Sequence, residues 1–467
     1  MLLAGSVSAR ELSQVPGVIH IQTAFDGGGN HTISQLVTLA KAEGIGVLIP
    51  TDHDLQVMEY GIPPFRNIIK KREKRDSVLE LGPERYLKEI SRANHLQKEV
   101  LVIPGVQSSP FYYWTGSPFK KNLVANDYRK ELLLIGLQSP EDYEGLPLLH
   151  RGFSTRYVKR LIPRTIIFLV AIGLSIYLVL QKGFLRIAGG LLGVFSLLLL
   201  INHHPFQSSP YDPYHGDQGI GPFQELIDYV DERNGLSFWS HPESNYAVRG
   251  VPLGPAMLKT PHYPDDLVAS TNYTGFESIY GDTITMTQPG KQWDQILNDY
   301  CTGERERPVW GISGADFRSG GSSGGVQLDT FQTIFLVYEK TTQEILNALR
   351  NGKFYAVRKG RASRLILDRF DAGDDKGGKL AISGDDLNLS GPPVVRGALS
   401  AEDGGRYQFE ALLIRSGKTV KTFKGETPFT FEYIDSEKLD GKRFYRLEVK
   451  GEALGRLLSN PIFVVRG

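Results

Sequence analysis

The sequence predicts an α/β domain that is interrupted by a transmembrane helical hairpin and followed by an antiparallel β-sandwich. Three observations support this fold class. Apolar strand-like segments alternate with amphipathic helical segments over residues 15–160 and 204–360. A stretch of almost uncharged, apolar residues, 161–203, separates these two regions. Over residues 361–467, short alternating runs are separated by Gly, Pro and Asp, which is typical of a β-sandwich.

The α/β region is expected to consist of short strand and helix units. Val18, Ile19 and Ile21 indicate the first strand, and the first helix begins near Thr32 and ends before Gly44. The other expected elements are strands at 45–54, 100–109, 131–138, 236–243, 275–281 and 309–317 and helices at 84–99, 221–234 and 291–303. This alternation is typical of a parallel sheet covered by helices, open or closed into a barrel, with its chemistry at the carboxyl ends of the strands.

The apolar stretch has two halves, 165–180 and 185–202, with a short polar break between them. Lys182 and Arg186, both at this break, are the only charged residues of the two halves and the turn. Each half with its flanks approaches the roughly 17–25 residues that a membrane-spanning helix needs. A pair of buried soluble helices is the alternative, but such helices normally keep a polar face. We therefore predict two transmembrane helices whose outer ends lie on the same side of the membrane.

Two signals for the side of the membrane disagree. Five basic residues precede the first span and two stand at the hairpin turn, which places the flanking domain on the cytoplasmic side of an inner membrane of the bacterial type. The N-terminal segment, 1–14, begins with MLLAGSVSA, which resembles the end of a secretory signal and indicates export. We favour the cytoplasmic side.

The composition argues against nucleic acid as a partner and excludes an internal disulfide. The chain has 467 residues, and its 53 basic residues nearly balance 52 acidic ones. Nucleic-acid binders usually carry a strong basic excess, so we do not expect nucleic acid as a partner. Cys301 is the only cysteine, which excludes an internal disulfide.

Polar residues gather at the ends of the predicted strands. His20 is followed by Gln22, and Asp26 stands in the next turn. On a strand, residues two apart point to the same side, so a second His at position 22 would aim two imidazoles at one metal ion. The other polar residues at strand ends are Asp52, His53, Gln107, Glu131, His241, Asp316 and Arg318.

The order of these motifs, "HIQT", "TDHD", "PGVQSS", "SHPE" and "GADF", resembles the PHP (polymerase and histidinol phosphatase) superfamily over residues 15–360, apart from the hairpin. The segments 344–357 and 459–464 also resemble the ends of standalone members. The resemblance implies a distorted (β/α)7 barrel, up to three bound metal ions, commonly zinc, manganese or iron, and hydrolysis of phosphoester bonds.

The resemblance carries over to nine positions, of which five keep a family ligand. These five are His20, Asp26, His53, His241 and Asp316. The replaced positions are Gln22 for a His, Gln107 for a bridging Glu, Glu131 for a His and Arg318 for the last His. Glu131 still offers a ligand, so the implied metal residues are these five and Glu131.

The replacements change the metal chemistry that the family implies. Gln22 offers a neutral amide oxygen, a poor ligand for zinc, and Gln107 removes a negative charge between two cations. Arg318 is always protonated and cannot coordinate a metal, but a guanidinium can clamp phosphate oxygens. We expect one or two weakly bound divalent ions, preferably Mn or Mg over Zn, or no ion.

Two functions follow from this pattern. The first is a membrane-anchored, metal-dependent phosphoesterase of low activity that acts on a small phosphorylated ligand, with Arg318 and Asp52 as catalytic residues. The alternative is a catalytically silent binding or scaffold protein at the membrane. Two further segments allow two interpretations each. The basic run 66–75 is a solvated helix face or a membrane contact, and the loop 202–219, with His203, His204 and His215, is an interfacial loop or a small metal site. The loop 319–325 is expected to be flexible and to lie beside the site.

Overall fold

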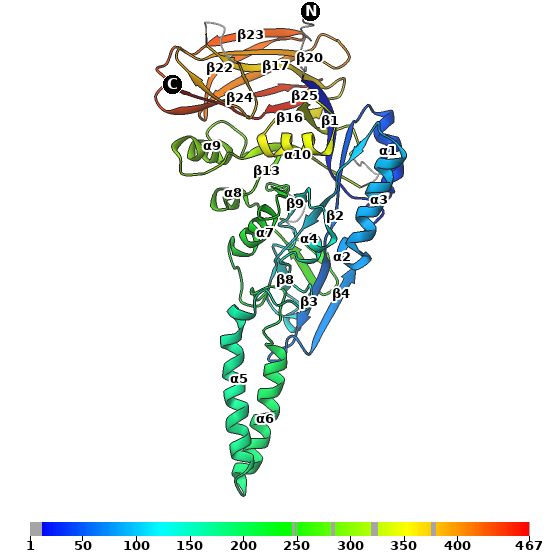
Figure 1. Ribbon diagram of the computed structural model, residues 1–467, viewed down its shortest axis with the longest axis vertical. Coiled ribbons are helices and arrows are strands. Elements are labelled where there is room, and N and C mark those ends of the chain that lie inside the picture. Colours follow the sequence, from blue (N-terminus) through cyan, green and yellow to red (C-terminus); the bar gives the residue numbers. More distant parts are fainter. Residues whose placement is uncertain are drawn as a thin grey trace, which may run out of the picture.

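The structure is a computed structural model that describes residues 12–244, 248, 250–281, 285–318, 326–374 and 380–466. Its three parts follow one another along the longest axis: a C-terminal β-rich region, a central barrel and a protruding pair of helices (Figure 1). The predicted loop 319–325 and the first eleven residues of the N-terminal segment lie outside the described residues.

The centre of the molecule is a closed barrel of seven strands. In order around the barrel they are β1 (Ser13–Ile21), β2 (Val47–His53), β6 (Gly105–Ser108), β9 (Leu132–Ile135), β10 (Leu236–Trp239), β13 (Gly275–Ile279) and β14 (Trp310–Phe317). The barrel closes because β1 pairs in parallel with both β14 and β2. Buried Val, Ile, Leu and Phe side chains from these strands form one core with the surrounding helices.

The barrel differs from the predicted (β/α)7 form because its strands are of mixed direction. β9 runs antiparallel to both β6 and β10, whereas the other neighbouring pairs of the barrel are parallel. A parallel return needs a crossover of a dozen or more residues, usually a helix. The chain between β6 and β9 instead forms β7 (Tyr113–Thr115), a short 3-10 turn (Pro118–Lys120) and β8 (Leu123–Asn126). The start of β9 therefore lies beside the carboxyl ends of the other strands.

Helices and a small hairpin surround the barrel. α1 (Ile33–Ala42) begins with a capping box in which Thr32 and Gln35 bind each other's backbone N–H groups. The remaining helices here are α2 (Val78–Leu81), α3 (Pro83–Leu96), α4 (Pro140–Glu144), α7 (Gly221–Asp231), α8 (Pro264–Ala269), α9 (Gln292–Thr302) and α10 (Thr342–Asn351). Further strands are β3 (Gln56–Gly61), β4 (Lys70–Arg75), β5 (Leu101–Val102), β11 (Val251–Leu253) and β12 (Ala256–Lys259). The basic run 66–75 is thus largely strand β4, paired with β3, and the helical alternative was wrong.

The apolar stretch forms two long helices, α5 (Val158–Val179) and α6 (Phe184–Asn202), which leave the barrel between α4 and α7 (Figure 1). Both are long and apolar enough to cross a membrane. Small and polar side chains lie between them: Thr165, Ser175 and Ser196 are buried, and the Ser175 hydroxyl donates to the carbonyl of Gly189 at 2.8 Å. Large apolar side chains face outward, between 62% and 70% exposed, at Ile167, Val170, Tyr177, Ile187, Leu191 and Val194. This arrangement is the reverse of a soluble helix pair.

The C-terminal region contains two sheets that share one hydrophobic core. One sheet consists of β18 (Ala381–Ile382), β17 (Leu365–Gly373), β20 (Val394–Ala401) and β23 (Phe429–Ile434). The other contains β19 (Asp386–Leu389), β26 (Ile462–Arg466), β24 (Lys442–Gly451), β25 (Gly455–Ser459), β21 (Gln408–Arg415) and β22 (Lys418–Glu426). β25 pairs with β16 (Phe354–Lys359), which continues through β15 (Phe331–Val337) to β1. The second sheet is therefore continuous with the barrel.

A buried ion pair joins the barrel to this region. Arg446 of β24 is fully buried, and its guanidinium donates from Nε and Nη2 to the two oxygens of Asp294 on α9, at 2.6 and 2.8 Å. Nη2 also donates to the carbonyl of Thr287 at 2.9 Å, and the guanidinium carbon lies 4.8 Å from the ring centre of Trp293. Because both charges are excluded from water, each depends on the other.

Replacing Asp294 with Ala should destabilise the chain by about 3–5 kcal/mol, because it leaves the Arg446 charge buried without its partner. The free energy of unfolding from urea titration, followed by tryptophan fluorescence, measures this loss. Gln295→Ala, at an exposed position of the same helix, is the matched control. An equal cost for the two variants would contradict the proposed role of the pair.

Candidate functional site

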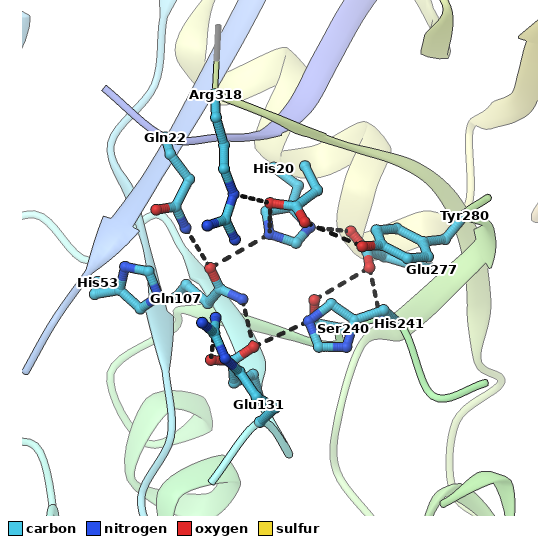
Figure 2. A network of polar contacts seen from close by, with 12 residues as sticks. His20, Gln22, His53, Gln107, Glu131, Ser240, His241, Glu277, Tyr280 and Arg318 are labelled. Carbon is cyan, nitrogen blue, oxygen red and sulfur yellow. Dashed lines mark hydrogen bonds and ion pairs between the residues drawn. The ribbon is translucent and has the colours of Figure 1, made fainter. Parts of the chain in front are cut away.

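The candidate site lies at the barrel end where the parallel strands finish and β9 begins (Figure 2). The structure brings together seven of the residues selected from the sequence, and their side chains point toward a common centre. Six of them are labelled in Figure 2: His20, Gln22, Gln107, Glu131, His241 and Arg318. The seventh is Asp316, which contacts His20 and Arg318. The convergence of residues so distant in sequence follows from the closure of the barrel.

The Gln107 amide connects three strands of the site. Its Oε1 accepts a hydrogen bond from Gln22 Nε2 at 2.5 Å and lies 3.3 Å from His20 Nε2. Its Nε2 donates to Glu131 Oε2 at 2.7 Å. The two glutamines therefore bind each other as donor and acceptor. Gln22 Oε1 is buried without a hydrogen-bond partner.

Glu131 is held as a carboxylate by cationic and imidazole neighbours. Its Oε2 lies 2.9 Å from His241 Nε2, and its Oε1 lies 3.9 Å from the Arg129 guanidinium. Burial alone raises the pKa of Glu131, but the hydrogen bond from His241 and the charge of Arg129 bring it down to about 2. Arg129 lies just before β9 and was not selected from the sequence.

Glu277 is a central residue of the site that sequence analysis missed. It stands in the middle of β13, in a segment whose pattern indicates only a buried strand. Its Oε1 lies 2.6 Å from His20 Nδ1, and its Oε2 accepts from Ser240 Oγ at 3.1 Å and from the His241 backbone N–H at 2.6 Å. This carboxylate therefore fixes the ring of His20 and the backbone of the "SHPE" motif at once.

Three residues of the site have a left-handed backbone that side-chain-bearing residues rarely adopt. The φ angles are 67° at His20, 33° at His241 and 42° at Asp316. At His20 the pairing of β1 with both neighbours shifts register, as in a β-bulge. Such conformations persist only where the surroundings hold them, and they are concentrated at functional sites.

Charges around His20 favour its protonated form. Burial alone lowers the pKa of His20, but the carboxylates of Glu277 and Asp316 raise it to about 9. The imidazole Nε2 lies 3.6 Å from Asp316 Oδ1. For Asp316 itself, burial raises the pKa, but His20 and Arg318 together hold it below its usual range.

A cavity of about 330 Å³ opens beside Asp316. Asp316 accepts hydrogen bonds from Arg318 Nε at 3.1 Å and from the Tyr280 hydroxyl at 3.0 Å. Arg129, His241 and Tyr280 line the cavity together with Asp316 and Arg318. Two guanidinium groups from different loops thus line one cavity, which is an arrangement suited to an anion.

Asp26 and His53 form a separate pair. Asp26 Oδ2 accepts from the His53 backbone N–H and lies 2.9 Å from His53 Nδ1, while Oδ1 accepts from Gly28 N at 2.7 Å. His53 lines a second cavity, of about 530 Å³, to which Glu131 and Arg129 also contribute.

Asp52, the other residue predicted to be catalytic, is fully buried. Its two oxygens accept from the backbone N–H and the hydroxyl of Thr23, at 2.6 and 2.9 Å. It therefore supports the turn after β1, and neither cavity described above includes it.

The donor set does not fit a metal centre of three or four ligands. Among the residues that the structure describes, no group of three or more His, Cys, Asp and Glu side chains is arranged to hold a metal ion. His20 Nε2 faces an amide oxygen, His241 Nε2 faces a carboxylate, and Arg318 occupies a position where the family resemblance implies an imidazole. The predicted one or two Mn, Mg or Zn ions stay a prediction.

Comparison with known proteins assigns no family. No family model matches the chain, and no curated protein matches it.

The raised pKa of His20 predicts that part of the chain's stability depends on pH. A group whose pKa rises from 6.5 to about 9 on folding contributes stability that is fully present below pH 6.5 and is lost as the pH rises through 9. Glu277→Gln removes the carboxylate that contributes most to this rise, so the loss of stability above pH 6.5 should become smaller.

Unfolding measured between pH 6 and 10, together with NMR titration of ring-labelled histidines, tests this. His20→Gln identifies the signal of His20. A pKa of His20 at or below its ordinary value would contradict the described charge arrangement.

Proposed function

We propose that this chain is a membrane-anchored, PHP-like protein that binds a small phosphorylated ligand in the cavity beside Asp316. The observation that carries the proposal is the pair of guanidinium groups, Arg129 and Arg318, on that cavity. A guanidinium has five N–H donors, and the bond from Arg318 to Asp316 engages the one on Nε. The planar fork of such donors matches the oxygens of a phosphate group.

Binding without metal-dependent hydrolysis is the function that the donor set supports best. The side chains that the family resemblance would assign to metal ions bind one another instead, from Gln22 through Gln107 and Glu131 to His241. Arg318 supplies a positive charge that is fixed to the protein. These contacts support the silent form of the PHP-like site, in which arginines attract the phosphate.

A slow phosphoesterase is the second candidate, and the Asp26–His53 pair favours it. A carboxylate that orients an imidazole beside a cavity is the arrangement of a general base. The turnover of p-nitrophenyl phosphate, described below, distinguishes this function from binding alone.

Membrane anchorage is the third part of the proposal. α5 and α6 are 22 and 19 residues long, or about 33 and 28 Å at 1.5 Å per residue, close to the hydrocarbon thickness of about 30 Å. Their outward-facing Ile, Leu, Val and Tyr side chains need an apolar surrounding, while small residues mediate the contact between the helices. The barrel then lies on one side of the membrane, close to its surface.

Inorganic phosphate should raise the melting temperature of the full chain, and Arg318→Gln should weaken phosphate binding about 10- to 100-fold. A hydrogen bond to a charged group contributes about 1.5–3 kcal/mol, which corresponds to this range. Isothermal titration in neutral detergent measures the affinity. Arg85→Gln, which removes the same charge from an exposed position on α3, is the matched control and should bind phosphate as the wild type does.

Turnover of p-nitrophenyl phosphate separates the two candidates. No turnover, with phosphate binding intact, supports the binding protein. Turnover that is lost in His53→Gln supports the slow phosphoesterase. Equal phosphate affinities of wild type and Arg318→Gln would contradict both.

The full chain should require detergent for extraction, whereas deletion of residues 163–202 should leave a folded chain that is soluble without it. The deletion removes most of the exposed apolar side chains of the two helices and none of the residues of the site. Ultracentrifugation of membranes and circular dichroism of the deletion variant measure these outcomes. Intact chain in the soluble fraction without detergent would contradict the anchor.

A further inference from the structure

A cavity of about 610 Å³ lies where α5 and α6 leave the barrel, and it belongs to neither site described above. We call it the juxtamembrane cavity. It is lined by the ends of both helices, by the β3–β4 hairpin and by the loop that follows α6. In Figure 1 the β3–β4 hairpin extends toward the base of the two helices.

The charges of the juxtamembrane cavity are mainly positive. Glu59, one of its two acidic residues, is already bound to Lys70 and lies 3.2 Å from His150 Nδ1. The other acidic residue, Asp212, lies 2.9 Å from His215 Nδ1.

Two arginines of the cavity are not neutralised in this way. Within the described part of the chain, neither Arg66 nor Arg164 has an ion-pair partner. Arg66 comes from the β3–β4 hairpin, where its guanidinium carbon lies 3.8 Å from the ring centre of Tyr214. Arg164 comes from the first turns of α5. The cavity therefore has a net positive lining that includes two guanidinium groups from different elements.

The walls of the juxtamembrane cavity are held together by hydrogen bonds. Asn67, in the turn of the β3–β4 hairpin, donates from its backbone N–H to Asn202 Oδ1 at 2.8 Å and from Nδ2 to the Asn202 carbonyl at 2.7 Å. The ring of Phe65 packs edge-on against Phe195 of α6, with 5.7 Å between their centres. These contacts fix the hairpin to the end of the helix, so the cavity is part of the fold.

Segments that line the cavity also expose apolar side chains. Ile62 and Ile69, in the hairpin turn that carries Arg66 and Asn67, are 47% and 52% exposed, and Phe153 of the lining, at 74%, stacks on Phe206. Exposed apolar side chains beside basic groups are typical of the boundary between headgroups and acyl chains. Leu161 of α5 and Ile201 of α6 line the cavity itself.

We infer that the juxtamembrane cavity binds the phosphate headgroup of an anionic membrane lipid, with the acyl chains lying along α5 and α6. The guanidinium groups of Arg66 and Arg164 bind the phosphate oxygens. Phe153 and the two helix residues in the lining favour a lipid over a free phosphate, because they would be in contact with its acyl chains. The inference rests on the proposed membrane anchorage and is independent of the barrel cavity.

The test compares lipids added to the full chain in neutral detergent, with binding followed as thermal stabilisation. Dioleoyl-phosphatidylglycerol should bind at least tenfold more tightly than dioleoyl-phosphatidylcholine. The double variant Arg66→Gln/Arg164→Gln should lose this preference, weakening phosphatidylglycerol binding about 30-fold, which is what two basic residues near an anionic membrane surface contribute together. Each single variant should lose about fivefold.

The matched control is Lys182→Gln/Arg186→Gln, which removes two charges at the turn between α5 and α6, at the ends of the helices far from the barrel. This variant should keep the preference for phosphatidylglycerol. Arg318→Gln should also keep this preference, because Arg318 lines the cavity beside Asp316 and not the juxtamembrane cavity. Equal affinities for the two lipids, or an unchanged preference in the double variant, would overturn the inference. Glycerol phosphate that competes as well as the lipid would assign the cavity to a soluble phosphate instead and would also overturn it. A chain that needs no detergent would contradict the anchor itself, which the extraction experiment detects separately.

Discussion

The Glu277 carboxylate lies on β13 inside the barrel, 3% exposed, and binds three groups, one on β1 and two at the end of β10. A buried carboxylate is costly unless it is fully hydrogen-bonded, and the His20 ring, the Ser240 hydroxyl and the His241 backbone N–H supply these bonds. The contact also explains Gly314 on the neighbouring strand, where a Cβ atom would collide with the carboxylate. The unusual backbone of His20 and His241 is maintained by this shared partner.

The sequence predicted much of the fold because its signals are local. Apolar runs and caps such as Thr32 located the main strands and helices, and the uncharged stretch located α5 and α6. The site was predicted where strand ends carry His, Asp or Gln. Glu277 was missed because one acidic residue in an apolar strand has no spacing pattern, and Arg129 was missed because it lies in a loop. The reversed direction of β9, which explains the place of Glu131, depends on pairing between distant segments and is not encoded in a local pattern.

Gln22, Gln107 and Glu131 are complementary to one another as hydrogen-bond donors and acceptors. Gln22 and Gln107 stand on different strands, yet the donor of one meets the acceptor of the other, and Gln107 in turn donates to Glu131. A buried polar group without a hydrogen-bond partner costs about 1–3 kcal/mol. Here one such atom, Gln22 Oε1, is left among these residues. The polar centre is therefore stabilised by its own hydrogen bonds.

Strand β4 physically separates the juxtamembrane cavity from the second barrel cavity. Successive residues of a strand point to opposite faces, and residues 70–73 of β4 follow this rule: Lys70 and Arg72 line the juxtamembrane cavity, while Lys71 and Glu73 line the cavity that contains His53. A lipid phosphate that attracts Lys70 or Arg72 would act on the same six-residue strand that forms a wall of the cavity that contains His53. The turn of this hairpin is hydrogen-bonded to the end of α6. One short hairpin therefore joins the end of α6, the juxtamembrane cavity and the cavity that contains His53.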